Sequence, residues 1–463
     1  MPASPESRHA TVPTVRPPVP AEPSPTPAAE AAHAWASVAT AGPICAEMRA
    51  ATAPPRILVV GSGWRFLSGI SYYTCRLANA LNTRYDVGAV LMRQLLPARL
   101  YPGRDRVGRQ LSDLRYDDGI PVFDGVDWWG VPSLARAVQF IRKFHPDVLV
   151  LQWWTGTVLH SYLALCIAAR LAGVRVIVEF HEVQDTGEAQ HRWAAAYVRK
   201  FIQPLLRRTD GVVVHSRFDQ KTLRQTYALS NVPLVVARHG PFDHHDAAVP
   251  EPRNPSGPRR ILFFGTIRPY KGLEDLIEAF ASLPRDYQLT VVGETWEGWD
   301  RPAGLIATSP AAGRIEFVNR YVADSEVDAY FAAADLVVLP YRRSSASGPL
   351  HIAMSHGLPV VVTAVGGLVE AAEEYPGAVF APAGDPAALS AAIRDADRLV
   401  GRRHADPSSW EKTVAAYDEL LSRIGVTPPP LAEAAASFVK EDQEAETTTS
   451  SNQTVPLFSP DLR

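Results

Sequence analysis

Two segments of the chain combine small residues, positive charge and a predicted helix start, which together suit an anionic ligand. In FFGTIRPYKGLEDLIEAF (263–280), a predicted strand ends at Gly265, and Arg268 and Lys271 precede a helix with one apolar face. Two cations beside the free N–H groups of a helix start form a site for a doubly charged phosphate. Taken alone, a tight turn with two solvent-facing basic residues explains this segment equally well.

The second segment, SSASGPLHI (344–352), follows a buried run that is typical of a strand. Ser347 or Gly348 is suited to cap a helix there, because Pro349 is favoured in a first helical turn. The hydroxyls and backbone N–H groups would then lie at the positive end of the helix dipole. A capped helix start without a ligand is the plainer interpretation, but two such starts after strands of one domain favour phosphate binding.

The first half of the chain offers a glycine-rich loop and a histidine, each after a predicted strand. GSGWRFLSGIS lacks the third glycine of a dinucleotide-binding fingerprint, because Phe66 stands in its place. We therefore expect a glycine-lined loop with Gly69 at the helix start. His181 and Glu182 follow the next candidate strand, in EFHEVQD. A lone histidine at a strand end is more often structural, and only its place at the ligand edge makes it a candidate.

Clusters of histidine and acidic residues do not predict a metal site. RHGPFDHHD (238–246) has three histidines and two aspartates, but it lacks regular ligand spacing and lies in a predicted linker. The acidic pair in YDDG (116–119) has no second element to support it. The three cysteines, Cys45, Cys75 and Cys166, are far apart, which argues for a reducing compartment and against zinc or a disulfide framework. We predict no metal and no cofactor.

The elements that would position these residues alternate between apolar runs and amphipathic helices. RILVVG (56–61) is typical of a buried parallel strand, and GISYYTCRLANALN (69–82) then places its apolar residues on one helical face. The alternation stops at a Pro- and Gly-rich segment and starts again after it. It predicts an α/β fold of two Rossmann-like, doubly wound parallel sheets facing a cleft, with ligands outside the carboxyl ends of the strands.

The two ends of the chain differ from its middle. Residues 1–55 hold twelve of the forty prolines and few large apolar residues, so this end cannot offset its ordering entropy, and the acidic tail is similar. The predicted parts are a disordered extension (1–54), an acceptor-side domain (55–240), a linker (241–258), a ligand-binding domain (259–408), a helix returning to the first domain (409–424) and a disordered tail (425–463).

Composition indicates a soluble globular protein with uneven charge. Its 463 residues are 46% hydrophobic, with no signal-peptide pattern and no apolar run long enough to span a bilayer. Residues 56–240 carry a net charge of +10, and residues 241–463 carry −12. These features predict a cytoplasmic protein, and the basic half leaves peripheral contact with the inner membrane face open beside plain solvation. The basic run WAAAYVRKFIQPLLRR fits a helix packed on the sheet better than a membrane contact, and no aromatic-interleaved basic stripe supports nucleic-acid binding.

In combination, these segments resemble family-four retaining glycosyltransferases of the GT-B fold. The donor-binding half is matched by FFGTIRPYKGLEDLIEAF, LTVVGETWEGW, IEFVNRYVADSEVDAYFAAADLVVLPY and SGPLHIAMSHGLPVVVTAVGGLVE. The first half resembles the acceptor half more loosely, through LSGISYYTCRLANALN, FHPDVLVLQWW, EFHEV, DGVVVHS and HGPFD. The resemblance runs from about Arg56 to Ile424, and WEKTVAAYDELLSRI looks like the helix that returns to the first domain.

The resemblance implies roles for residues that match the family's motifs. Lys271 matches the lysine that holds the donor diphosphate, and Arg268 would replace an arginine usually found where Thr266 stands. Gly69 matches a glycine near the phosphates, and His181 matches a histidine near the transferred sugar. The loop whose backbone meets the diphosphate corresponds to Ser347, Gly348 and Leu350.

Two glutamates that are common in the family are missing. They usually flank the helix start and contact the donor sugar and the nucleotide ribose, and Ser344 and Ile352 occupy their places. Glu370 or Glu294 could supply a carboxylate instead.

The resemblance implies an enzyme that moves a sugar from a nucleotide diphosphate sugar to an acceptor hydroxyl, with retention of configuration and without a metal. It does not indicate the acceptor, which could be a glycan, a lipid-linked sugar or a small molecule. Two alternatives stay open: a sugar-nucleotide-binding or scaffolding protein of this fold without transfer activity, and a sugar-nucleotide epimerase.

Overall fold

The computed structural model describes residues 53–63, 69–94, 114–127, 130–183, 192–229, 231–242, 257–295 and 299–430. Nearly all of the predicted extension, most of the predicted linker, residues 64–68 of the glycine-rich loop and residues 431–463 lie outside these stretches. Residues 425–430, which the sequence assigns to the tail, continue from the last helix, and Arg84 donates to the Pro429 carbonyl at 2.6 Å.

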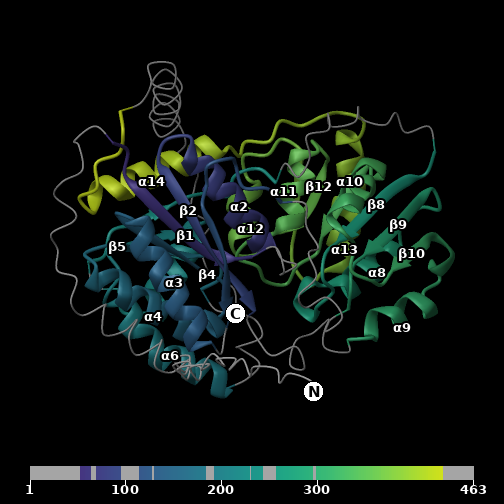
Figure 1. Ribbon diagram of the computed structural model, residues 1–463. Coiled ribbons are helices and arrows are strands. Elements are labelled where there is room, and N and C mark those ends of the chain that lie inside the picture. The colour runs from purple at the N-terminus through teal and green to yellow at the C-terminus, as the bar shows by residue number, and fades with distance from the viewer. Residues whose placement is uncertain are drawn as a thin grey trace, which may run out of the picture.

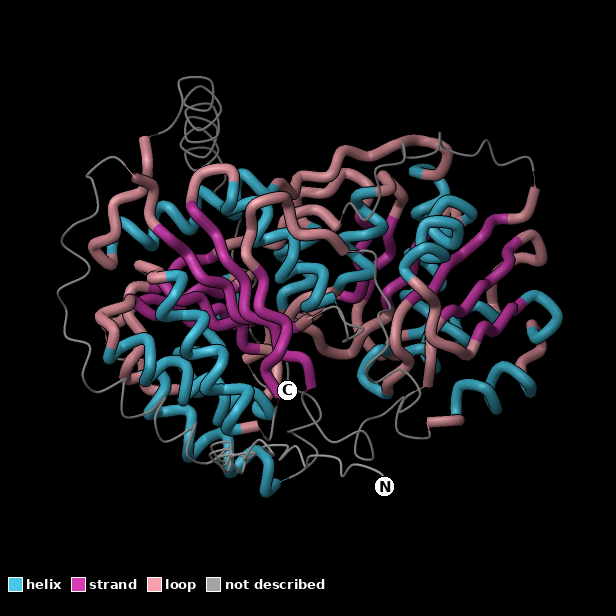
Figure 2. The backbone as a smooth tube through the Cα atoms, in the orientation of Figure 1, coloured by secondary structure: helices cyan, strands magenta, loops and turns pink. Residues whose placement is uncertain are grey.

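Seven parallel strands form the N-terminal sheet, in the order β3-β2-β1-β4-β5-β6-β7 (Figures 1 and 2). The central strands are mostly apolar because both faces of the sheet are covered, and all six residues of β4 are buried. The strands are β1 (Arg56–Ser62), β2 (Asp86–Gln94), β3 (Val122–Asp127), β4 (Val148–Trp153), β5 (Arg175–Phe180), β6 (Gly211–Val214) and β7 (Leu234–Val236).

Helices cover both faces of this sheet. Ile141, Leu165 and Ile202 belong to three helices that share one hydrophobic core, whereas Leu77 packs into the core on the other side. The buried Ile202 places the apolar face of its helix, the basic run noted above, against the domain core, as predicted. The helices are α2 (Gly69–Asn82), α3 (Val131–Phe144), α4 (Leu159–Leu171), which follows the short 3-10 turn η4 (Gly156–Val158), α6 (Arg192–Leu206) and α7 (Arg217–Thr226).

The last helix, α14 (Trp410–Arg423), returns to the N-terminal domain, and Figure 1 shows it in yellow against that domain. Tyr417 and Leu420 are fully buried in the core that also holds Leu77. Asp418 accepts a hydrogen bond from Tyr85. The chain therefore crosses between the two domains twice.

Six parallel strands form the C-terminal sheet, in the order β10-β9-β8-β11-β12-β13. The strands are β8 (Arg259–Phe264), β9 (Tyr287–Val292), β10 (Ile315–Val318), β11 (Leu336–Leu339), β12 (Val360–Thr363) and β13 (Ala378–Ala381). The helices are α8 (Leu273–Ala281), α9 (Arg301–Thr308), α10 (Asp324–Ala333), α11 (Gly348–Ser355), α12 (Gly367–Ala372) and α13 (Pro386–Ala396), with 3-10 turns η5 (Pro269–Lys271), η6 (Ala312–Arg314) and η7 (Asp397–Leu399).

The order of the strands places the candidate residues. The direction of winding reverses between β1 and β4 in the first sheet and between β8 and β11 in the second. Doubly wound sheets bind ligands at this switch point, outside the carboxyl ends of the strands. Arg268 and Lys271 follow β8, and the loop before Ser347 follows β11. Both segments predicted to bind phosphate therefore lie at the switch point of the second sheet, and the predicted fold class is confirmed.

Among the helices that the structure describes, none is both long and apolar enough to cross a membrane.

Candidate active site

Lys271 is buried where the loop after β8 meets the first turn of α11. A Cβ atom added to Gly265 would lie 3.0 Å from Lys271 Nζ and 3.3 Å from Pro349 Cγ, so the ammonium and the first turn of α11 both lie beside Gly265. Nζ is also 5.1 Å from the centroid of the Tyr341 ring, a position that favours a cation. Burial is the main cause that lowers the pKa of Lys271. The protein therefore holds a cation in a site shielded from water, beside the start of α11.

Backbone geometry fixes the position of this lysine. Gly272 has a φ of 62°, a conformation open to glycine at low cost, and a Cβ atom there would overlap the Pro340 carbonyl oxygen. The loop after β8 is therefore pressed against the end of β11. Arg268 is partly buried at the start of the same loop, and its charge also contributes to the lowered pKa of Lys271. Two cations thus share this site.

Helix α11 begins as the sequence predicts, with Ser347 as its N-cap. The Ser347 hydroxyl accepts from the Leu350 N–H at 3.3 Å, and both residues are buried. Pro349 has no N–H group. Within the described stretches, the Gly348 N–H is the one first-turn donor of α11 that no hydrogen bond uses. The structure therefore leaves Gly348, rather than the Ser347 hydroxyl or the Leu350 N–H, to donate to an anion.

Phe242 joins the two domains at their seam, which we define as the contact of Gly69, Phe242 and Gly348. A Cβ atom on either glycine would lie 3.6 Å from Phe242 Cε1, so the first residues of α2 and α11 lie against one ring. The ring stacks on Tyr72 at 4.7 Å and on His351 of α11 at 5.5 Å between centroids. The helix starts predicted to bind phosphate in each domain are thus close together.

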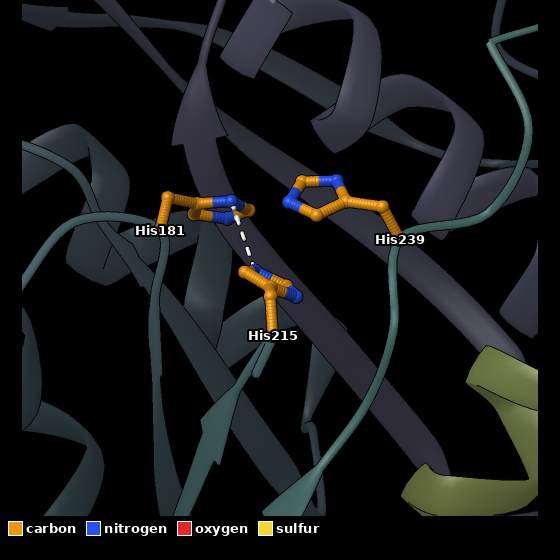
Figure 3. A group of neighbouring side chains, drawn as sticks. All are labelled: His181, His215 and His239. Atoms are coloured by element: carbon orange, nitrogen blue, oxygen red, sulfur yellow. Dashed lines mark hydrogen bonds between the residues drawn. The ribbon is translucent and has the colours of Figure 1, made fainter. Parts of the chain in front are cut away.

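Three histidines follow neighbouring strands of the first sheet and meet inside the protein (Figure 3). His181 follows β5, His215 follows β6, and His239 lies just beyond β7. His215 Nδ1 lies 2.8 Å from the Ala237 carbonyl oxygen, so this nitrogen carries a proton and donates it. His215 Nε2 then accepts from His181 Nδ1 at 3.0 Å. A backbone carbonyl therefore fixes the tautomers of both rings.

Burial keeps these rings neutral. It lowers the pKa of His215 to about 4 and the pKa values of His181 and His239 well below their usual range. His351 lies 5.1 Å from His239 between ring centroids, and burial lowers its pKa to about 4 as well. At neutral pH these histidines can accept or donate hydrogen bonds but carry no charge.

Glu179 lies beneath the histidines at a fully buried position of β5. Its Oε1 accepts from the Tyr73 hydroxyl at 2.7 Å, and its Oε2 accepts from the Gln152 amide at 3.2 Å. Burial raises the pKa of Glu179 to about 7, although these hydrogen bonds act in the opposite direction. The edge of the Tyr73 ring contacts His181 at 4.6 Å between centroids. A polar network thus links β4 and β5 to Tyr73 of α2, beside the histidines.

Glu182 and Glu294 lie near the loop that carries the two cations. The charge of Glu182, which follows His181, acts on Lys271 and raises its pKa, so the end of β5 faces this loop across the domains. The Glu294 carbonyl accepts from the Ile267 N–H at 2.8 Å, which places Glu294 beside the same loop.

Glu370 has a different environment from a sugar-binding carboxylate. Its two oxygens accept the backbone N–H groups of Arg217 and Phe218, both at 2.7 Å. These N–H groups begin α7 of the N-terminal domain, whereas Glu370 belongs to α12 of the C-terminal domain. Glu370 therefore joins the two domains. Both of its carboxylate oxygens already accept hydrogen bonds from α7, away from the site of Lys271.

Sequence reasoning missed His215, His239, His351 and Phe242. His215 is isolated in its segment, whereas His239 and Phe242 lie in RHGPFDHHD, a stretch whose Pro and Gly content indicates a linker. One signal was present: a histidine follows a strand-like run three times, in EFHE, VVHS and ARHG. Because neighbouring parallel strands end at one edge of a sheet, such a repeat predicts a cluster.

Known families match both domains. The family described as “Glycosyl transferases group 1” matches residues 258–396, and “Glycosyl transferase 4-like domain” matches residues 68–240. Together the two matches cover 312 of the 463 residues. Together the two matches support a glycosyltransferase of the group 1 type.

Curated relatives match this chain over part of their length. A D-inositol 3-phosphate glycosyltransferase of Salinispora arenicola is 33% identical, over 37% of this chain and 44% of the relative. The GDP-mannose:glycolipid 4-beta-D-mannosyltransferase of Xanthomonas campestris is 36% identical, over 31% and 42%. The 2-deoxystreptamine glucosyltransferase of Streptomyces kanamyceticus is 26% identical, over 58% and 72%. The chain thus spans less than half the length of the first two relatives.

Solved structures share the arrangement of this chain at low identity. Sucrose-phosphate synthase from Thermosynechococcus elongatus has a TM-score of 0.56 at 16% identity, covering 85% of this chain and 100% of that one. Anabaena HepE, solved with UDP and glucose, has a TM-score of 0.52 at 18% identity, covering 86% and 100%. The likeness confirms the predicted GT-B fold.

Proposed function

We propose that this chain transfers a sugar from a nucleotide diphosphate sugar to an acceptor hydroxyl, with retention of anomeric configuration and without a metal in the transfer step. The observation that carries the proposal is the meeting of Lys271 with the first turn of α11 at the switch point of the second sheet. The match to the group 1 glycosyltransferase family supports it, as do a relative named for GDP-mannose and a structural neighbour solved with UDP.

Departure of the nucleoside diphosphate is the step that these groups would accelerate. Negative charge develops on the leaving phosphate as the bond between the sugar and the phosphate oxygen breaks. The cations Arg268 and Lys271, the Gly348 N–H and the dipole of α11 would stabilise that charge. Because Lys271 is buried, water screens its attraction for the phosphate only weakly.

Retention follows if the acceptor attacks the face that the diphosphate leaves. In this scheme the acceptor oxygen bonds to the anomeric carbon, and a phosphate oxygen of the leaving group takes the acceptor proton. Neutral, buried His181 would hold a sugar hydroxyl by a hydrogen bond, without contributing charge. Closure of the domains about Phe242 would exclude water, which competes with the acceptor.

Binding without transfer is the second candidate, and one observation favours it. The places of the family's two glutamates are taken by Ser344 and Ile352, and Ile352 is a buried apolar side chain. Carboxylates that would orient the donor sugar and ribose are thus missing at these positions. A protein of this kind would bind the donor and leave it intact.

The acceptor side has one exposed surface suited to a lipid-linked acceptor. Tyr197 and Phe201 are exposed on α6, and Lys200 lies over the Phe201 ring at 5.5 Å. Aromatic rings beside cations are favoured at the surface of anionic membranes. We expect the protein to sediment with anionic vesicles but not with neutral ones, and the double variant Tyr197→Ser with Phe201→Ser to sediment less. Equal sedimentation of the wild type and this variant would count against the membrane contact.

Product analysis of a donor panel tests the proposed activity. The purified full chain is incubated with UDP- and GDP-sugars, with and without a mixture of candidate acceptors, and NMR identifies the products. We expect release of nucleoside diphosphate and a product whose anomeric configuration matches the donor. Lys271→Ala should abolish both, whereas Lys143→Ala, which removes an exposed lysine of α3, should not. Binding without turnover would support the second candidate, an epimerised donor would indicate an epimerase, and an inverted product would refute retention.

A further inference from the structure

The three histidines after β5, β6 and β7 form a cluster in which only His181 has a role in the proposed transfer. We propose that His181, His215 and His239 bind a single divalent cation of borderline softness, such as Zn²⁺. One ring nitrogen from each histidine can be chosen so that the three atoms lie within 4.8 Å of one another, and all three side chains are buried (Figure 3). They come from three neighbouring strand ends, so the sheet itself sets their spacing.

Unused nitrogens in this cluster are the first argument for a ligand. Both ring nitrogens of His239 are buried and have no hydrogen-bond partner within the described stretches, and the same holds for His181 Nε2. His239 is 8% exposed and His181 5%, so bulk water does not satisfy these atoms. Buried polar atoms without partners are rare, because each costs about 1–3 kcal/mol. A neutral imidazole has one lone pair, so a metal ion would bind through one nitrogen of each ring.

His215 shows the second argument, which is preorganisation. Its Nδ1–H donates to the Ala237 carbonyl at 2.8 Å, so its Nε2 lone pair faces the other rings. Histidines that bind metals commonly hold their other ring N–H in this way, which fixes the tautomer and orients the ring. The arrangement thus presents His215 as a ligand before any ion is bound.

The distances require only small side-chain movements. Zn–N bonds of about 2.0–2.1 Å in a tetrahedral site place ligand atoms roughly 3.4 Å apart. The His181 Nδ1 and His215 Nε2 atoms are 3.0 Å apart, and one nitrogen from each of the three rings can be chosen so that all three lie within 4.8 Å of one another. Binding through these two atoms would replace their hydrogen bond, and the His181 proton would move to its Nε2. Ring rotations can supply the rest.

The surroundings offer a counter-charge and a fourth ligand. Glu179 lies beneath the cluster, with a carboxylate oxygen 3.8 Å from His215 Nε2 and another 3.9 Å from His181 Nε2. His351 has a buried Nδ1 without a partner among the described residues, and its ring centroid lies 5.1 Å from that of His239. Because His351 belongs to α11, an ion held by all four rings would also join the two domains.

The donor set determines which metals should bind. Neutral imidazoles favour Zn²⁺, Cu²⁺ and Ni²⁺, whereas Mg²⁺ and Ca²⁺ prefer oxygen ligands. We therefore expect Zn²⁺ to bind and Mg²⁺ not to bind. If the proposed transfer function is correct, Zn²⁺ should also inhibit it, because His181 is the proposed contact of the sugar.

Metal titration of the full chain tests the proposal without any nucleotide sugar, so its result is separate from that of the transfer assay. Chelator-treated protein is titrated with Zn²⁺ by calorimetry and with Co²⁺ by visible absorption. We expect one equivalent of each, a Co²⁺ spectrum typical of four nitrogen or oxygen ligands, and a higher melting temperature with Zn²⁺. His215→Ala and His239→Ala should each weaken Zn²⁺ binding at least tenfold.

Matched controls separate this site from other histidines. His145→Asn changes an exposed histidine at the end of α3 and should bind Zn²⁺ like the wild type. Circular dichroism of the metal-free variants shows whether they fold. If His239→Ala does not fold, the Co²⁺ spectrum of the wild type decides the question. No stoichiometric binding, binding unchanged in folded His215→Ala and His239→Ala, or a six-coordinate or thiolate Co²⁺ spectrum would each overturn the proposal.

Discussion

The surroundings of Lys271 disfavour its charged ammonium form when no anion is bound. Burial lowers its pKa, and the carboxylate of Glu182 across the seam only partly opposes this effect. A bound diphosphate would bring two negative charges to a place where water screens poorly, and would favour the ammonium form. Ligand binding and the protonation of this one side chain are therefore coupled.

Nucleotide affinity should fall as the pH rises through the lowered pKa of Lys271. The ammonium form pairs with the diphosphate, so the complex keeps a proton that the free protein loses, and binding takes up a proton at alkaline pH. Calorimetry with UDP and GDP from about pH 7 to 10, in buffers of different ionisation enthalpy, measures both effects. Lys271→Met should bind weakly without this dependence. If the nucleotide affinities of the wild type and of Lys271→Met change with pH in the same way, ligand binding is not coupled to the protonation of Lys271.

Gly272 tests how strictly the backbone positions this lysine. Gly272→Ala adds a Cβ atom that overlaps the Pro340 carbonyl in a conformation unfavourable for alanine. The free energy of unfolding should fall by at least about 1–2 kcal/mol, and nucleotide affinity should fall with it. Chemical denaturation gives the first value and calorimetry the second. Gly304→Ala in α9 is the matched control, because its Cβ meets open space, and it should lower neither. Equal effects of the two variants would contradict this role of Gly272.

At the scale of elements, a carboxylate from one domain caps a helix of the other. Glu370 of α12 accepts the first N–H groups of α7, where the helix dipole favours negative charge. Beside it, the backbone of Gly366 and Gly367 lies so close to the carbonyls of Ser344 and Ser345 that a side chain on either glycine would clash. The start of α12 therefore supports both the loop before α11 and the contact between the two domains.

Loss of the Glu370 carboxylate should loosen the closed arrangement. Glu370→Ala leaves the α7 N–H groups without this acceptor, and we expect about 0.5–2 kcal/mol less stability. Small-angle scattering should show a larger radius of gyration, and the donor concentration at half-maximal rate should rise more than the maximal rate changes. Glu278→Ala, an exposed change on α8, serves as the control. A Glu370→Ala protein that behaves like this control would exclude a role in closure.

At the scale of the molecule, α14 ties the C-terminal end of the chain to the N-terminal core. Leu420 is fully buried, and a Cβ atom on Gly211 of β6 would lie 3.0 Å from one of its methyl groups. Folding of the first domain therefore depends on residues that follow the second. Leu420→Ala should cost about 2–5 kcal/mol, measured by denaturant unfolding. Leu171→Ala, at a position 57% exposed, should cost little, and similar costs for both variants would contradict this packing.

The parts of the fold that depend on local pattern were predictable from the sequence. Continuous apolar runs gave the strands, and Pro349 with Ser347 gave the start of α11. The lysine site was predictable because its two segments each follow a strand. The histidine cluster was not, since His181, His215 and His239 meet only when the strand order is known. The role of Phe242 was also missed, because a buried ring in a Pro- and Gly-rich segment has no periodic neighbours.

A diphosphate site formed by Lys271 and the start of α11 is central to the proposed function. Comparing nucleoside diphosphates with the corresponding monophosphates tests this site most directly. Calorimetry compares UDP with UMP and GDP with GMP for the wild type, Lys271→Ala and Lys143→Ala. At least one wild-type pair should show the diphosphate binding about tenfold more tightly or better, because a charge-assisted contact contributes about 1.5–3 kcal/mol. Lys271→Ala should remove most of that difference, and Lys143→Ala should keep it. No preference for a diphosphate in the wild type, or a preference that survives in Lys271→Ala, would contradict the site.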